Sequence, residues 1–140
     1  MQKGLRLFRI HGIDVFVHFS WWIIVVLFAY SLRADFFPNA YPGLSFTLYW
    51  LMGILAAVLL FVSVIFHELT HSFVARAFKV PVDHITLFFF GGVASLPTEH
   101  IKPKTEFWMA LSGPLFSLAL AAVLYLVSRL SLPFVVAAIS

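Results

Sequence analysis

The chain contains no cysteine and very little charge. Without cysteine it forms no disulfide and offers no thiolate to a metal, so any metal site must use histidine and carboxylate ligands. Only 11% of the 140 residues are charged, whereas 62% are hydrophobic, and the mean hydropathy is +1.01. Soluble domains average about 25% charged residues. The composition therefore excludes both a small soluble domain and a disordered chain, and it indicates an integral membrane protein.

Three apolar runs with few charged residues are long enough to cross a bilayer as helices. We expect membrane spans at about residues 13–32, 44–78 and 107–128. The apolar residues from Leu130 to Ser140 are interpreted as the start of a fourth span. The first run follows Lys3, Arg6 and Arg9, as a signal peptide would, but its length and the lack of a small-residue cleavage site favour a retained span.

The segment from Ile85 to Leu96 differs from these runs. It is rich in β-branched and aromatic residues, contains the pair Gly91-Gly92 and is too short to span a membrane as a helix. We expect a strand there, and a close backbone approach at the two glycines. The predicted fold is an all-α polytopic membrane protein with three spans, the start of a fourth, and a short strand-like membrane-associated segment.

The basic residues fall unevenly on the two sides of the predicted spans. Those on the side of the N-terminus are Lys3, Arg6, Arg9, Arg76, Lys79, Lys102 and Lys104. Only Arg33 and Arg129 lie on the opposite side. Because positive residues accumulate in cytoplasmic loops, we expect a multi-pass protein of the cell membrane with a cytoplasmic N-terminus. Orientation in the bilayer accounts for the net charge of +3, so we expect no nucleic-acid partner.

One motif carries the chemistry, and it lies within the second apolar run. His67-Glu68-Leu69-Thr70-His71 has the form H-E-x-x-H. Residues four apart share one face of a helix, so the two imidazoles can bind one ion, for which Zn²⁺ is the natural choice. Glu68 is then beside the ion as a general base. A solvated helix face without metal is the alternative, but ionisable residues inside a membrane span are costly and mark functional sites.

Four segments together resemble the site-2 protease family of intramembrane zinc metalloproteases. They are GIDVFVHFSWW, FHELTHSFVARAFKV, ITLFFFGGVASL and LSGPLFSL, in the family's order, and the resemblance runs from about Leu5 to Ser128. It implies that His67 and His71 bind zinc, and that Glu68 activates a water and passes its proton to the leaving amine.

The resemblance also implies an activity and a class of partner. The chain would be a zinc-dependent intramembrane endopeptidase that cleaves transmembrane segments of membrane-tethered regulatory proteins, with single-span membrane proteins as substrates. Such a substrate must be unwound before it is cut. We expect an edge strand at Ile85–Phe90 to bind the unwound segment by strand addition.

The family's third zinc ligand has no counterpart in the sequence. In the family it is an aspartate followed by glycine on a later span, whereas none of Asp14, Asp35 and Asp83 precedes a glycine. We expect the missing ligand beyond Ser140, with residues 1–140 forming the N-terminal part of a single membrane-embedded metalloprotease domain. The alternatives are a non-catalytic membrane protein that binds metal or substrate through an incomplete site and, less favoured, a metal transporter.

Several polar residues outside the motif have plainer interpretations. Asp14 and His18, four residues apart near the start of the first span, are expected to form an interfacial pair. The remaining histidines and glutamates are expected to be solvated, namely His11, His84, His100, Glu99 and Glu106.

Overall fold

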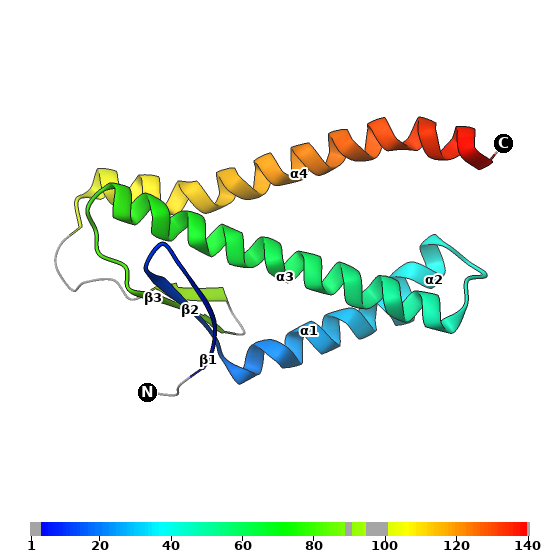
Figure 1. The fold of residues 1–140 in the computed structure, drawn as a ribbon, viewed down its shortest axis with the longest axis horizontal. Helices are drawn as coiled ribbons and strands as arrows, with labels where there is room; N and C mark the ends of the chain where they lie inside the picture. The colour runs from blue at the N-terminus through cyan, green and yellow to red at the C-terminus, as the bar shows by residue number, and fades with distance from the viewer. Residues whose placement is uncertain (1–3, 89–90, 95–100, 140) are drawn as a thin grey trace.

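The computed structural model describes residues 4–88, 91–94 and 101–139, with side chains described as far as Leu130. A small sheet lies at one end of a set of long helical segments (Figure 1). The elements in chain order are β1 (Leu5–Ile10), β2 (Ile13–Val17), α1 (Phe19–Ser31), the π-helical turn η1 (Leu32–Phe36), α2 (Phe37–Ala40), α3 (Phe46–Ala77), β3 (His84–Phe88), β4 (Gly91–Ala94) and α4 (Pro103–Ile139).

Within the described residues, three helical segments are long and apolar enough to cross a membrane. They are Phe19–Ala40, Phe46–Ala77 and Pro103–Leu130. Large apolar side chains cover their outward surfaces; Leu118, for example, is 67% exposed. Such a surface is untenable in water but suits contact with lipid. The prediction of a membrane protein built mostly from helices is therefore confirmed, but the fold is not all-α, because the helices are accompanied by a four-stranded sheet rather than by one strand-like segment.

The boundaries of the predicted spans need two corrections. Residues 13–17, which we placed in the first span, form β2, and the helix starts only at Phe19. Alternation decides this, because Ile13, Val15 and Val17 are buried while the residues between them are not. The predicted start of a fourth span at Leu130 is not seen either, because the backbone of α4 continues without a break to Ile139.

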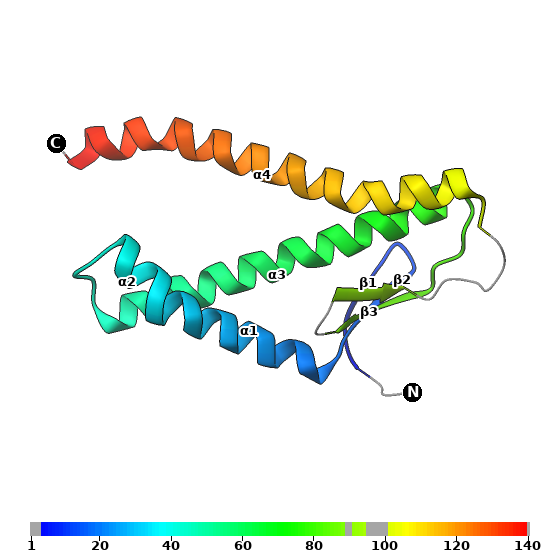
Figure 2. The same ribbon diagram turned by 180° about the vertical axis from the view of Figure 1, so that it is seen from behind.

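Helix α3 lies between α1 and α4 and carries the core of the molecule (Figures 1 and 2). The Ser45 side chain caps its first turn by accepting a hydrogen bond from the Leu48 amide at 3.3 Å. Lys79, with φ of +64°, ends it in a left-handed turn two residues before Pro81. Residues at intervals of three or four line its buried face: Gly53, Ala57, Phe61, Ile65, Leu69, Ser72 and Ala75.

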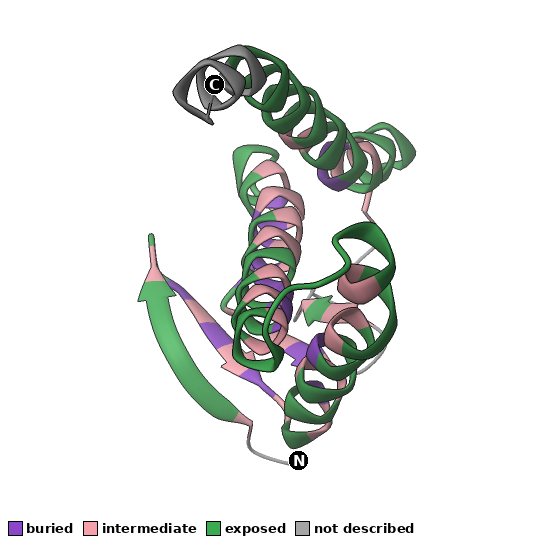
Figure 3. Ribbon diagram, turned by 90° about the vertical axis from the view of Figure 1, so that its right-hand side faces the viewer, coloured by how far each residue is buried: buried purple, intermediate pink, exposed green. Residues whose placement is uncertain are grey.

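The sheet has the order β1-β2-β3-β4. β1 and β2 form an antiparallel hairpin around His11 and Gly12, which both have positive φ, while β2 and β3 are parallel because α1 and α3 lie between them in the chain. The inner residues of β2 and β3 pack with Phe61, Ile65 and Leu69 of α3 in one core cluster. Figure 3 shows these buried residues along α3 and on the strands facing it.

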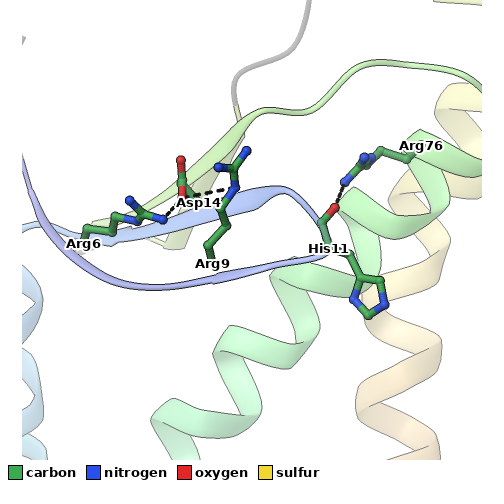
Figure 4. Close-up of polar contacts among 5 residues, drawn as sticks. All are labelled: Arg6, Arg9, His11, Asp14 and Arg76. Atoms are coloured by element: carbon green, nitrogen blue, oxygen red, sulfur yellow. Dashed lines mark hydrogen bonds and ion pairs between the residues drawn. The ribbon is translucent and has the colours of Figure 1, made fainter.

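The topology changes two further expectations. The strand predicted at Ile85–Phe90 is present as β3 as far as Phe88, and Phe89 and Phe90 lie outside the described residues. β3 lies between β2 and β4, so the edge strand on that side of the described sheet is β4. Asp14 and His18 are not one helical turn apart, because Asp14 lies in β2 and His18 is the N-cap of α1. The Asp14 carboxylate instead pairs with Arg6 at 2.8 Å and Arg9 at 3.8 Å (Figure 4).

Candidate active site

The two histidines of the H-E-x-x-H motif meet on one face of α3. The Nε2 atoms of His67 and His71 lie 3.1 Å apart, with their rings edge to face. Two nitrogens that bind one tetrahedral zinc at 2.0–2.1 Å are about 3.3 Å apart. The pair is therefore already close to the separation that a zinc ion requires, and both histidines are half-buried between α3 and α4.

Helix α4 supplies the outer hydrogen-bond partners of both imidazoles. His71 Nδ1 donates to the carbonyl oxygen of Met109 at 2.6 Å. His67 Nδ1 lies 2.8 Å from the hydroxyl of Ser117. The Ser112 hydroxyl also donates to the Met109 carbonyl, at 2.7 Å. Outer contacts of this kind orient histidine ligands and leave Nε2 to face the metal.

Close packing of α4 against the histidines depends on Gly113. A Cβ at this position would collide with Nε2 of His71 and would lie 2.6 Å from Nε2 of His67. Only glycine leaves this space open. The Gly-Pro pair that marked the LSGPLFSL segment in the sequence therefore has a steric role in the site.

Glu68 points to the other side of the motif, toward β4. A Cβ at Gly92 would lie 2.6 Å from both Cδ and Oε2 of Glu68. Its neighbour Gly91 has φ of +122°, which L side chains rarely adopt. The close backbone approach that we expected at this glycine pair is present, and it places the edge strand directly against the general-base candidate.

A cavity of about 270 Å³ opens between α3, β4 and α4 beside these residues. Its lining combines Glu68 and His71 with mostly small or apolar side chains: Ser72, Ala75, Val82, Gly92, Ala94, Glu106, Met109 and Ala110. Glu106 is exposed, as expected, but it also contributes to this lining. Predominantly apolar pockets with a few converging polar groups are the usual form of binding sites.

The donor set fits zinc but is incomplete within the described residues. In residues 4–88, 91–94 and 101–130, no group of three or more His, Cys, Asp or Glu side chains converges on one point. Asp14 is paired with Arg6, and Asp35 accepts a hydrogen bond from Asn39 in the segment just after α1. A zinc site of the catalytic type uses three protein ligands. The prediction of an aspartate beyond Ser140 stays a prediction.

The other histidines lie elsewhere. His11 is in the β1–β2 turn, where its carbonyl accepts a hydrogen bond from Arg76, and His84 in β3 contacts the Phe16 ring (Figure 4 shows the first of these). His100 and Glu99 lie outside the described residues. Our sequence analysis missed Ser117 and the Met109 carbonyl. No side-chain pattern signals either contact, because the Met109 contact is to a backbone carbonyl and the Ser117 contact depends on how α4 packs on α3.

The sequence of the chain matches a known protein family. Residues 55–138 match the sequence pattern described as Peptidase family M50. A putative zinc metalloprotease, Rip3, of Mycobacterium tuberculosis is 43% identical over 122 residues, covering 87% of this chain and 31% of that protein. The putative zinc metalloprotease sll0528 of Synechocystis is 42% identical over 120 residues, covering 86% of this chain and 31% of that protein.

A solved structure agrees with the sequence comparisons. The site-2 protease from Methanocaldococcus jannaschii matches with a TM-score of 0.63 and 31% identity, over 91% of this chain and 52% of that one. The chain spans about a third of the length of the curated relatives that it matches. From the family pattern, the relatives and the shared fold, the chain belongs to peptidase family M50, the site-2 proteases.

Proposed function

We propose that the chain forms part of a zinc-dependent endopeptidase that cuts peptide bonds within the membrane. The observation that carries the proposal is the facing pair of imidazoles, 3.1 Å apart, with Glu68 beside them in a helix apolar enough to span a bilayer. From His67 to Arg76 the helix rises by roughly 13 Å, so the motif lies below the basic end of α3. The zinc metalloproteases among its relatives support the same chemistry.

The residues divide the work of hydrolysis between them. His67 and His71 would hold the zinc, which when bound polarises the peptide carbonyl and makes a water acidic enough to lose a proton. Glu68 accepts that proton and returns it to the leaving amine as the peptide bond breaks. Because β4 contacts Glu68 at Gly92, the carboxylate is held at the edge strand rather than free in the cavity.

We propose that the substrate is an unwound segment of a single-span membrane protein bound along β4. A transmembrane peptide bond is held in helical hydrogen bonds, so it must become extended before it can be attacked. An edge strand offers unpaired backbone groups to an extended segment. β4 is the edge of the described sheet nearest to Glu68 and lines the same cavity, which supports β4 rather than β3 as the docking strand.

Substitution of Glu68 by Gln tests the proteolytic mechanism. We expect E68Q to keep most of its bound zinc, because both histidines remain, and to lose cleavage because the amide accepts no proton. Membranes from cells with the unsubstituted protein and from cells with E68Q would be compared by mass spectrometry of protein termini. New termini inside transmembrane segments should occur only with the unsubstituted protein.

The control is Asp35→Asn, which makes the same change of charge in the segment after α1 and should leave cleavage intact. Persistence of the same termini in E68Q would contradict the protease mechanism. Bound zinc without any difference in termini between the unsubstituted protein and E68Q would instead favour a non-catalytic metal-binding protein.

A further inference from the structure

The hydrogen bond of His71 to Met109 fixes the tautomer of that imidazole. A backbone carbonyl only accepts hydrogen bonds, so the 2.6 Å contact requires a proton on Nδ1 of His71. A neutral imidazole with its proton on Nδ1 carries a lone pair on Nε2. His71 therefore presents that lone pair to Nε2 of His67, 3.1 Å away.

The tautomer of His67 then depends on what lies between the two rings. Without a metal, two lone pairs at 3.1 Å repel each other, so His67 must carry its proton on Nε2 and donate it to His71. With a metal, both Nε2 atoms must offer lone pairs, so the proton of His67 must be on Nδ1. The same imidazole therefore needs opposite tautomers in the two states, with one ring proton in each.

The hydroxyl of Ser117 is the group that can serve both states. It lies 2.8 Å from Nδ1 of His67, and a hydroxyl can donate or accept a hydrogen bond by rotation about one bond. A carbonyl in its place would only accept a hydrogen bond, and it would therefore keep the His67 proton on Nδ1, as the Met109 carbonyl does for His71. A carboxylate would do the same and add charge within the membrane span.

We propose that Ser117 is a positioning residue that lets His67 change tautomer when zinc binds. Without metal, the Ser117 hydroxyl donates to Nδ1 while Nε2–H of His67 donates to His71. On binding, Nε2 of His67 would give its proton to water, Nδ1 would take a proton from water, and the Ser117 oxygen would become the acceptor, so the charges of the ring and of the solvent do not change. This inference rests on the proposed function only in taking zinc as the ligand.

The geometry of α4 keeps this hydroxyl in place. Ser117 follows Gly113 by one helical turn, and the absence of a side chain at Gly113 is what allows α4 to approach both rings. Ser117 itself is exposed on the side of α4. Loss of its hydroxyl therefore leaves no cavity in the hydrophobic core.

Threonine and valine at position 117 form a matched pair, since they have nearly the same shape and differ in the hydroxyl. Zinc affinity would be measured on the full chain in detergent by competition with a zinc-chelating dye. We expect Ser117→Thr to bind within about threefold of the unsubstituted protein and Ser117→Val to bind about 10- to 100-fold more weakly. Ser128→Val, on the same helix, controls for loss of a serine hydroxyl far from the histidines. Equal affinities of the Thr and Val variants would overturn the proposal.

The tautomer is read directly by ¹⁵N NMR of histidine-labelled protein. We expect His67 of the metal-free protein to carry its proton on Nε2 and to move it to Nδ1 when zinc is added. A metal-free His67 with its proton on Nδ1 would overturn the proposal. This readout is separate from catalysis: zinc binding with the expected exchange but without cleavage would contradict the proposed function alone.

Discussion

Two glycines determine what the histidines and the glutamate of the motif can do. Gly113 of α4 lies against the Nε2 atoms of both histidines, and Gly92 of β4 lies against the carboxylate of Glu68. The backbone does not require glycine at position 92 or 113, because neither residue has a positive φ; in β4 the positive φ belongs to Gly91. Their role is the space that they leave, so a single methyl group at either position tests one half of the site.

Alanine at Gly113 should abolish zinc binding. Its Cβ would collide with Nε2 of His71 and lie 2.6 Å from Nε2 of His67, so the methyl group occupies the region that both lone pairs face. We expect at least a 100-fold loss of zinc affinity, measured by chelator competition, together with loss of cleavage. Leu118 of the same helix, which is 67% exposed, changed to Ala, is the control and should retain zinc. A G113A variant with unchanged affinity would show that the metal site lies elsewhere.

At the scale of elements, the contact that matters most is that of β4 with α3. The sequence predicts α3 well, because the apolar run at residues 44–78 is a local signal. It also predicts strand character after Ile85. It does not predict that β3 lies inside the sheet, because that follows from the pairing of β3 with β2, some 70 residues earlier in the chain.

The difference between local signals and pairing with distant strands also explains why the start of the first span was predicted wrongly. The residues from Val15 to Leu32 form one uncharged and mostly apolar run, and nothing local separates a strand paired to β3 from a helix in lipid. The outer partners of the histidines were missed for a related reason. The Met109 contact is a backbone carbonyl, which no side-chain pattern reveals, and Ser117 has meaning only once α4 packs on α3.

Alanine at Gly92 should separate zinc binding from turnover. Its methyl group would lie 2.6 Å from Cδ of Glu68, so either the carboxylate or strand β4 must move away. We expect normal zinc affinity, because neither histidine is touched, and a drop in cleavage rate of about 100-fold, the order that misplacement of a catalytic group by 1 Å costs. Val26→Ala, at a residue of α1 that is 63% exposed, is the control and should behave like the unsubstituted protein. Full cleavage by G92A would mean that β4 does not position Glu68.

At the scale of the whole molecule, the sheet and Arg76 lie at the same end. The sheet lies near the end of α3 that carries Arg76, whereas α2 and the α2–α3 connection lie at the opposite end (Figures 1 and 2). Arg76 donates to the His11 carbonyl and so ties the β1–β2 hairpin to this end of α3. If positive residues mark the cytoplasmic side, the sheet and its edge strand lie toward the cytoplasm.

The absence of cysteine makes this orientation simple to test, since any single introduced cysteine is the only thiol in the chain. Pro42→Cys lies in the α2–α3 connection, and Lys104→Cys lies in the first turn of α4. We expect a membrane-impermeant maleimide to label P42C in intact cells and K104C only after the cells are opened. The cysteine-free protein gives the background. Labelling of K104C in intact cells would reverse the orientation, and the substrate segment would then reach β4 from outside the cell.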